Sequence, residues 1–452
     1  MITGSMLIII FVLSLAALFF LILKMKLDPF ISLIVVAFLT ALVIGFPISD
    51  IPGIITQGFG DTLVGGVGIL IGLGVIFGEF LGASGAIEKI AAGIMRIFGV
   101  KRSPAGLSIT GIAVSIPVFF DAAFVILSGL LKSLAKKTGI SIITFVTALG
   151  VGLILAHSMI APTPGPIVVA ENTGSDLGLF IIYGIICAIP AALVGGYFYG
   201  SFIGKRIHPS LDEIEAQLPE IEAKPKKEIS SGLSFFLLGL PIILILLNTV
   251  TDLWLGDNSI SKFLGFIGDK NIALLISLIV GIIVLKPYID VPYNKLYTQA
   301  MNSAGGMIIL ITGAGGAFGA VIKQSGIGGD YLIDTMQGGW NIPILLLVFI
   351  FSQILRASLG SATVALVTTS SIMGPMAMEL GVSPVLLGLA ICAGAVGLSL
   401  PNDSGFWVVN KFGRLTIPQT IQAWSIGGFI AGLTALAMVY FLSLFTGILP
   451  GI

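Results

Sequence analysis

The chain is poor in charge, cysteine and histidine. Only 10% of its 452 residues are charged and the formal net charge is zero, which excludes a strongly basic surface for nucleic acid. Its two cysteines, Cys187 and Cys392, lie in apolar runs, so the sequence indicates neither a disulfide framework nor a metal site. The sequence also has no nucleophile–base pair and no phosphate-binding loop, so we expect no enzymatic activity and no cofactor.

Hydrophobic residues, in contrast, make up 56% of the chain, and the mean hydropathy is +1.11. These values predict an all-α polytopic membrane protein. Residues 5–23 form an apolar run that no basic stretch precedes, so we interpret them as a first membrane helix rather than a cleaved signal peptide. The 59 glycines favour close packing between such helices.

Ten apolar runs are long enough, or nearly so, to cross about 30 Å of hydrocarbon. One long polar stretch, 206–231, divides them into two sets of five and predicts a cytoplasmic linker between a first half, 1–205, and a second half, 232–452. The runs fall at 5–23, 29–46, 63–83, 140–175, 178–203, 234–250, 271–286, 302–322, 384–412 and 418–446.

Two further apolar segments, 104–132 and 342–372, do not fit as crossings. Polar residues and proline cut the first at Pro117-Val-Phe-Phe-Asp-Ala122 and leave arms of roughly 16–21 Å, too short to span. The second is cut likewise at Leu355-Arg-Ala-Ser-Leu-Gly-Ser361. We therefore predict two re-entrant hairpins; one long distorted crossing in each place is the alternative.

The distribution of basic residues supports the hairpins. If both return to the side that they left, eighteen Lys and Arg residues fall in inside loops, whereas Lys262, Lys270 and Lys323 fall outside. Counting either hairpin as a crossing removes this bias. The same count places both termini outside the cell and gives each half five crossings plus one hairpin.

An odd number of crossings inverts the second half relative to the first, and weak internal similarity supports that relation. Gly74-Val-Ile-Phe-Gly78 recurs as Gly315-Gly-Ala-Phe-Gly319, 241 positions later. Pro162 recurs as Pro401 at an offset of 239. We therefore predict an inverted repeat, which is typical of secondary transporters.

Two of the crossings are themselves broken, 140–175 at residues 162–166 and 384–412 at residues 401–405. Broken membrane helices survive only where protein or a water-filled cavity satisfies the freed backbone groups. Together with the hairpin tips, these breaks predict a site near the membrane midplane, where the starts of half-helices attract anions. The candidate substrate-binding residues are Asp121, Thr163, Gly165, Arg356, Ser358, Ser361, Thr363, Asn402, Asp403 and Ser404.

Arg356 is the one basic side chain that we place at membrane depth. A buried arginine requires an anionic partner, and its planar fork matches a carboxylate. That partner is either the carboxylate of a substrate or a permanent salt bridge to Asp121 or Asp403.

Four titratable residues are candidates for carrying a coupling proton. Burial favours the neutral form of a carboxyl group, so Asp121 or Asp403 could bind one; Asp403 could equally cap the helix that follows it. Glu79 is a candidate relay or a helix-packing contact. His157 lies shortly before the first break. It is either a proton carrier, because histidine titrates near physiological pH, or a structural group.

Several of these segments resemble the gluconate permease family, a group within the ion transporter superfamily. They are Phe120-Asp-Ala-Ala-Phe-Val-Ile, His157 with Pro162-Thr-Pro-Gly-Pro166, Gly315-Gly-Ala-Phe-Gly with Ser325-Gly326, Leu355-Arg-Ala-Ser-Leu-Gly-Ser-Ala-Thr-Val364 and Asn402-Asp-Ser-Gly-Phe-Trp407. The resemblance implies proton-coupled uptake of gluconate or a related sugar acid across the bacterial cytoplasmic membrane. Related folds imply a homodimer with an elevator-like motion.

Two positions depart from the gluconate carriers that the chain resembles. Those carriers have a glutamate where Asp121 stands and a histidine where Thr163 stands, so glycerate, fructuronate or D-serine are also candidate substrates. Our hypothesis is a proton-coupled symporter of a small hydroxy-carboxylate. The alternatives are sodium coupling and, from a different class, an anion channel, although a channel requires a continuous polar pore.

Overall fold

The structure is a computed structural model that describes residues 5–64, 68–207, 227–254, 259–302, 306–325, 343–376, 381–401 and 403–452. The described residues form helices and connecting turns, with no strand among them. Most of the predicted linker, the candidate Asn402 and the side chain of Ser358 lie outside the described residues.

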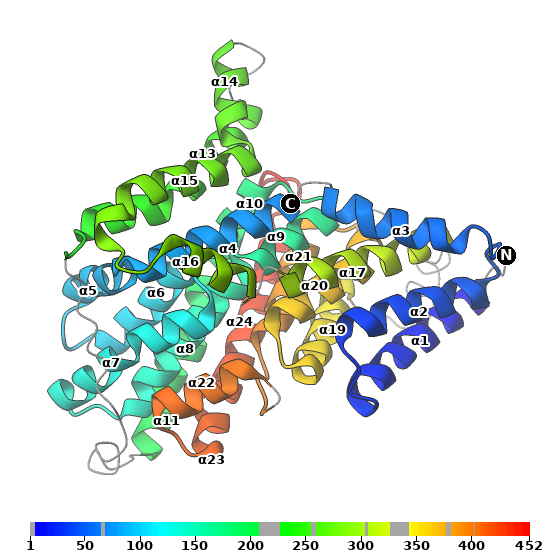
Figure 1. Ribbon diagram of the computed structural model, residues 1–452. Coiled ribbons are helices and arrows are strands. Elements are labelled where there is room, and N and C mark those ends of the chain that lie inside the picture. Colours follow the sequence, from blue (N-terminus) through cyan, green and yellow to red (C-terminus); the bar gives the residue numbers. More distant parts are fainter. Residues whose placement is uncertain are drawn as a thin grey trace.

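The first half of the chain contains eleven described α-helices; α6, α7 and α11 lie beside α8, whereas α1, α2 and α3 lie at the other end of the molecule (Figure 1). Their bounds are α1 Ser5–Phe19, α2 Pro29–Ile44, α3 Ile51–Thr62, α4 Gly68–Ala83, α5 Ala86–Phe98, α6 Ser103–Ser115, α7 Phe120–Thr138, α8 Ile142–Met159, α9 Pro164–Thr173, α10 Leu177–Ala191 and α11 Tyr199–Arg206.

The second half contains a comparable set of described helices, of which α14 projects from the body in Figure 1 together with the end of α13. Their bounds are α13 Ser231–Trp254, α14 Ser259–Gly268, α15 Lys270–Leu285, α16 Tyr293–Ala300, α17 Gly306–Ser325, α19 Ile344–Leu359, α20 Ala362–Met373, α21 Pro384–Val396, α22 Ser404–Gly413, α23 Ile417–Thr420 and α24 Ile426–Ser443; a π-helical turn, η8 (Ile421–Ser425), joins the last two.

Six helices in the described part are long and apolar enough to span a membrane. A seventh span arises if α4 and α5, which meet at 71°, are counted together. The remaining apolar helices are shorter than 18 residues, so ten crossings, the two hairpins and the inverted repeat stay predictions. The six are Ile142–Thr173, Leu177–Arg206, Ser231–Thr251, Lys270–Tyr288, Ile308–Ser325 and Ile417–Ser443.

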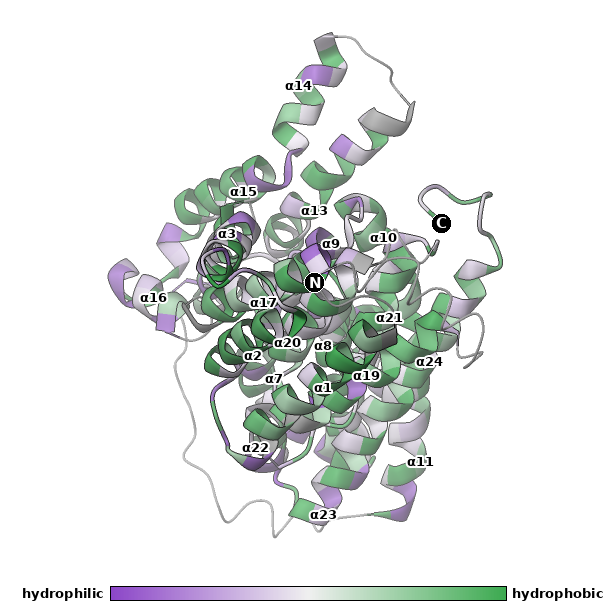
Figure 2. Ribbon diagram, turned by 90° about the vertical axis from the view of Figure 1, so that its right-hand side faces the viewer, coloured by the Kyte–Doolittle hydropathy of each residue, from purple (hydrophilic) through white to green (hydrophobic). Residues whose placement is uncertain are grey.

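The surface has the character of a protein immersed in lipid. Figure 2 shows hydrophobic residues along most of the helix lengths and hydrophilic residues mainly near their ends. Phe263 on α14 and Ile283 on α15, for example, are 63% and 67% exposed. Exposed apolar area of this kind requires a bilayer or a partner to cover it.

Helices are interrupted within each of the four irregular segments of the sequence. Residues 116–119 separate α6 from α7, and residues 160–163, which include Pro162, separate α8 from α9. Gly360, with φ of 72°, ends α19, and Leu398, with φ of 47°, follows the end of α21. Proline and left-handed backbone are incompatible with a continuing helix.

New helices begin after the interruptions, and two of them have side-chain caps. The Ser361 hydroxyl accepts a hydrogen bond from the Val364 amide at the start of α20. The Asp403 carboxylate accepts one from the Gly405 amide at the start of α22. These caps fix where each half-helix starts.

The glycines of the repeated motif lie against the interrupted segments. A Cβ at Gly78 of α4 would approach the Pro117 carbonyl oxygen to 2.1 Å, and one at Gly74 would approach the Pro162 carbonyl to 3.2 Å. On α17, a Cβ at Gly319 would come within 2.6 Å of the Ser371 carbonyl oxygen. Glycine therefore allows α4 and α17 to approach these backbones closely.

Candidate substrate-binding site

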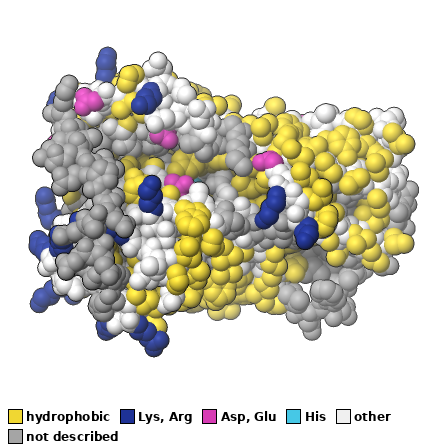
Figure 3. Space-filling model, turned by 60° about the horizontal axis from the view of Figure 1, so that its bottom comes forward, with side chains coloured by type: hydrophobic (Ala, Val, Ile, Leu, Met, Phe, Trp, Pro, Cys, Tyr) yellow, Lys and Arg dark blue, Asp and Glu magenta, His cyan; other side chains and the backbone are white. Residues whose placement is uncertain are grey.

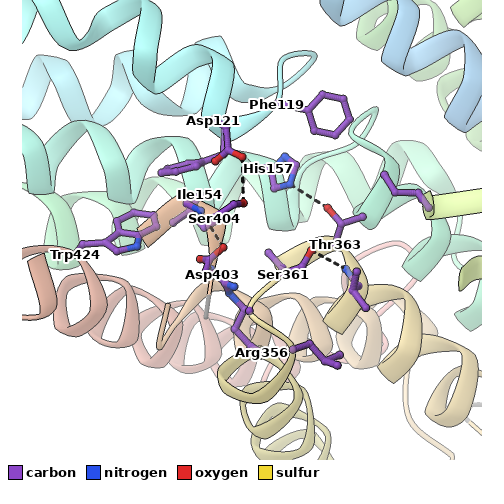
Figure 4. A pocket seen from close by; sticks show the side chains of 17 residues that line it. Phe119, Asp121, Ile154, His157, Arg356, Ser361, Thr363, Asp403, Ser404 and Trp424 are labelled. Atoms are coloured by element: carbon purple, nitrogen blue, oxygen red, sulfur yellow. Dashed lines mark hydrogen bonds and ion pairs between the residues drawn. The ribbon is translucent and has the colours of Figure 1, made fainter. Parts of the chain in front are cut away.

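A cavity of about 370 Å³ lies where three of the four irregular segments meet (Figure 4). It is bounded by the start of α7, the α19–α20 turn and the start of α22, with α8 and the η8 turn completing the wall. Its lining residues are Phe119, Phe120, Asp121, Ile154, His157, Ile308, Arg356, Leu359, Gly360, Ser361, Ala362, Thr363, Val364, Asp403, Ser404, Gly405 and Trp424.

Arg356 and Asp403 form a buried ion pair at one side of this cavity. The Arg356 Nη2 atom lies 2.5 Å from Asp403 Oδ2, and Arg356 is only 1% exposed. The Ser399 hydroxyl also donates to Asp403 Oδ2, and the Gly405 amide donates to Oδ1 at 3.0 Å. The sequence left Asp121 and Asp403 open as intramolecular partners of Arg356, and in the structure the partner is Asp403.

The ion pair uses only part of the guanidinium. Among the described residues, the Nε and Nη1 atoms of Arg356 have no hydrogen-bond partner. Buried polar groups are normally satisfied, and an unmet charged donor is costly. Arg356 therefore retains donor capacity for an anion that enters the cavity.

Asp121 has different surroundings from Asp403. It lies in the first turn of α7, is partly exposed, and accepts a hydrogen bond of 3.3 Å from the Ser404 hydroxyl. Asp403 is held by one cation and two further donors, whereas the Ser404 hydroxyl makes only a long hydrogen bond to Asp121. Asp121 is thus the cavity carboxylate that a proton or a substrate hydroxyl can reach.

His157 connects two elements of the wall. Its Nε2 atom lies 3.1 Å from the Thr363 hydroxyl, which joins the end of α8 to the first turn of α20. The imidazole also lies 5.7 Å from the Phe119 ring, measured between centroids. In Figure 4 the His157 and Thr363 side chains point toward each other across the cavity.

An aromatic wall completes the cavity, and our sequence reasoning did not include it. Phe120 stacks on Trp424 with centroids 4.8 Å apart and an interplanar angle of 26°. The indole packs so closely on α8 that a Cβ at Gly150 would lie 3.0 Å from its ring carbons. Trp424 lies in the apolar run that follows the last broken helix. The only signal in the sequence that could have identified it is that a single large aromatic residue stands in this part of the run.

Three candidate residues do not line the cavity. The Thr163 hydroxyl is buried and donates to the Ile160 carbonyl at 2.6 Å, within the break. Gly165 faces α20, where a Cβ would lie 2.6 Å from Leu366 Cδ1. Glu79 lies on α4, partly buried and engaged in a contact of its own.

The charged lining consists of two carboxylates and one guanidinium. Within the described part of the chain, no group of three or more His, Cys, Asp or Glu side chains is arranged to hold a metal ion. The remaining polar side chains of the lining are hydroxyls, one imidazole and the indole of Trp424, groups that are able to form hydrogen bonds.

Interrupted membrane helices that meet at a partly charged cavity of this size are typical of membrane permeases. The sequence profile of the GntP family permeases matches residues 6–445. The chain therefore belongs to the GntP permease family, and the family resemblance noted in its motifs is confirmed.

Two curated relatives and one solved structure illustrate the similarity. The chain is 37% identical over 437 residues to an uncharacterized permease of Haemophilus influenzae, covering 90% of this chain and 88% of the relative. It is 32% identical over 447 residues to the gluconate permease of Bacillus subtilis, covering 96% and 99%. The YdaH transporter of Alcanivorax borkumensis has a similar fold, with a TM-score of 0.61 at 17% identity over 92% of this chain and 97% of that one.

Proposed function

We propose that this permease is a proton-coupled symporter that carries gluconate or a related small sugar acid into the cell across the cytoplasmic membrane. The single observation that carries the proposal is one cavity lined by a buried guanidinium, a second, less tightly held carboxylate and several hydroxyls. The gluconate permease of Bacillus subtilis, similar over nearly its whole length, supports the substrate class.

In this proposal Arg356 binds the carboxylate of the substrate through nitrogens that Asp403 leaves free. Ser361, Thr363 and Ser404, at the starts of α20 and α22, bind substrate hydroxyls. Asp403 orients the guanidinium, in keeping with its capping of α22. Thr163 and Gly165 shape the first break instead of contacting substrate, as their contacts outside the cavity support.

Asp121 carries the coupling proton. The cavity lining holds one more carboxylate than guanidinium, so a bare monoanion would enter a site that is already negative. A proton on Asp121 removes that repulsion. The site then has the same net charge empty as it has when loaded with one proton and one monoanion, so a complete transport cycle moves no net charge across the membrane.

Several features at the scale of the whole carrier belong to the same proposal. They are the inverted repeat, a homodimer, an elevator-like movement and termini outside the cell. The basic residues support the sidedness: Figure 3 shows Lys and Arg side chains gathered mainly on one part of the lower face, while hydrophobic side chains cover the other part.

Uptake of labelled gluconate into proteoliposomes tests the proposal. We expect an inward proton gradient to drive accumulation, a sodium gradient to have no effect, and a potassium diffusion potential without a pH gradient to give no accumulation. Accumulation that follows sodium and ignores pH contradicts proton coupling. Flux that does not saturate and shows no counterflow identifies a channel instead.

A further inference from the structure

A second cavity, of about 380 Å³, lies away from the proposed substrate site. It is formed by α3, the end of α9, α17 and the residues that follow α20. Its polar lining comprises Asp61, Thr62, Glu171, Asn172, Thr173, Lys323 and Ser371.

Helix α20 connects the two cavities. Its first turn, with Thr363, lines the first cavity, and Ser371 near its end lines the second. Eight residues at 1.5 Å per residue separate these side chains by about 12 Å along the helix. Every residue from Ala362 to Met373 is buried, so α20 lies inside the protein between the two spaces.

The barrier at the second cavity is closely packed. The Asn172 side-chain amide of α9 donates to the hydroxyls of Ser370 and Ser371 at 2.9 and 3.1 Å. On the opposite side, a Cβ at Gly315 of α17 would lie 2.4 Å from the Ser371 hydroxyl oxygen. These contacts hold α9, α17 and α20 together between the two cavities.

The second cavity lies toward the opposite side of the molecule from the first. In Figure 1, α3, α9 and α17 lie above α7 and α22, which contribute to the first cavity. Lys323 belongs to the lining, and Lys270 pairs with Glu171 of the lining. Both are among the few basic residues that the charge distribution predicts to lie outside. The second cavity therefore faces the predicted outer side.

Its chemistry matches that of a hydroxylated monoanion. Lys323 supplies an exposed ammonium for a carboxylate, while Glu171 is already paired with Lys270. Asp61 accepts hydrogen bonds, and Asn172, Thr62 and Ser371 offer amide and hydroxyl groups. Its volume is close to that of the first cavity, so it is large enough for a solute of similar size.

We propose that this second cavity, the outer vestibule, is a binding site for the same class of solute, a hydroxylated monocarboxylate. The solute binds there before the Asn172 contacts with Ser370 and Ser371 open and admit it to the first cavity. This inference rests on the proposed function, because it assumes that such solutes are transported inward.

Protection of an engineered thiol tests the vestibule. Thr62→Cys is made in a chain in which Cys187 and Cys392, both fully buried, are replaced by alanine, so that background labelling is low. A membrane-impermeant maleimide is then added outside intact cells. We expect labelling from outside, slowed about tenfold by gluconate at ten times its Kd and unchanged by the uncharged polyol mannitol.

Two further variants separate the vestibule from the first cavity. In an Arg356→Gln background uptake is lost, yet gluconate should still protect Thr62→Cys. Lys323→Gln should remove most of the protection, whereas the control Lys262→Gln, on α14 and outside the lining, should retain it.

Each of the following outcomes contradicts either the vestibule site or the proposed function. Labelling only from inside overturns the vestibule site, and so does loss of protection in Arg356→Gln protein that still unfolds cooperatively. Protection by sodium chloride alone, without an effect of gluconate, indicates a cation site and also overturns it. If gluconate is taken up but does not protect the thiol, only this inference is wrong. If no sugar acid is taken up and none protects the thiol, the proposed function is wrong.

Discussion

At the scale of single residues, the two carboxylates of the first cavity differ in what holds them. Asp403 receives an arginine, a serine hydroxyl and a backbone amide, while the Ser404 hydroxyl donates to Asp121 across 3.3 Å. A carboxylate that is already neutralised by an ion pair gains little from a proton. This contrast selects Asp121 over Asp403 as the proposed site of proton coupling.

We therefore expect Asp121→Asn to abolish accumulation driven by a pH gradient while leaving exchange of labelled for unlabelled substrate. The amide keeps a hydrogen bond to Ser404 but cannot release a proton. Asp121→Glu is the matched control and should retain accumulation. Uptake against a gradient by the asparagine variant, measured in proteoliposomes, would clear Asp121 of this role.

Arg356→Ala should abolish uptake and also lower stability. Loss of charge-assisted hydrogen bonds to the substrate, about 1.5–3 kcal/mol, lowers affinity about 10- to 150-fold. The variant also leaves Asp403 buried without its cation, which costs about 3–5 kcal/mol. Expression therefore falls with the single variant, a consequence that the sequence alone did not suggest.

The double variant Arg356→Ala with Asp403→Ala separates these effects. It removes the uncompensated charge, so the unfolding temperature should recover in part while uptake stays absent. Recovery of uptake in the double variant would show that the arginine serves only to neutralise Asp403.

At the scale of helices, the interrupted segments depend on the glycine faces that support them. The Gly78 face of α4 contacts the turn between α6 and α7, directly before the Asp121 helix. The corresponding glycine of the repeated motif, Gly319, contacts the end of α20. Both motif copies thus act by allowing close approach to segments that shape the two cavities.

Gly78→Ala should accordingly displace the α6–α7 turn and reduce uptake strongly. Its Cβ would lie 2.1 Å from a backbone oxygen, and overpacking of this kind costs about 1–3 kcal/mol. Gly72→Ala on the same helix is the control, because nothing lies within 4 Å of its added Cβ. Thermal unfolding and uptake of the two variants check this; equal behaviour would show that the α4 contact is unimportant.

At the scale of the whole molecule, sidedness decides which cavity the solute meets first. The positive-inside rule predicts that the loop with Lys24 and Lys26 is cytoplasmic and that both termini are outside. The same count predicts an inverted repeat with a hairpin in each half. If either hairpin were a full crossing, the C-terminus would change sides.

Reporter fusions test this topology directly. Alkaline phosphatase fused at the C-terminus should be active, because that enzyme requires the oxidising outer compartment, and green fluorescent protein fused there should be dark. A fusion within the 206–231 linker is the internal control and should behave in the opposite way. Fluorescence from the C-terminal fusion would refute the inverted arrangement.

Much of this organisation can be predicted from the sequence because it is encoded locally. Apolar length predicts burial in a bilayer, and basic residues predict its sidedness. Pro117, Pro162 and Gly360 each lie where a helix is interrupted, since proline and left-handed glycine act on the backbone regardless of their neighbours. The position of Arg356 within an apolar segment also predicts, without any structure, that the guanidinium needs an anionic partner.

Only the tertiary structure decided which distant residues meet. It brought Asp403 rather than Asp121 to Arg356, added Phe120 and Trp424 to the cavity wall, and turned Gly165 toward Leu366. The sequence fixes the chemistry and spacing within each segment, but the relative rotation of segments hundreds of residues apart results from how all their side chains pack together. For the same reason, the sequence did not predict the outer vestibule, whose lining comes from four elements of both halves.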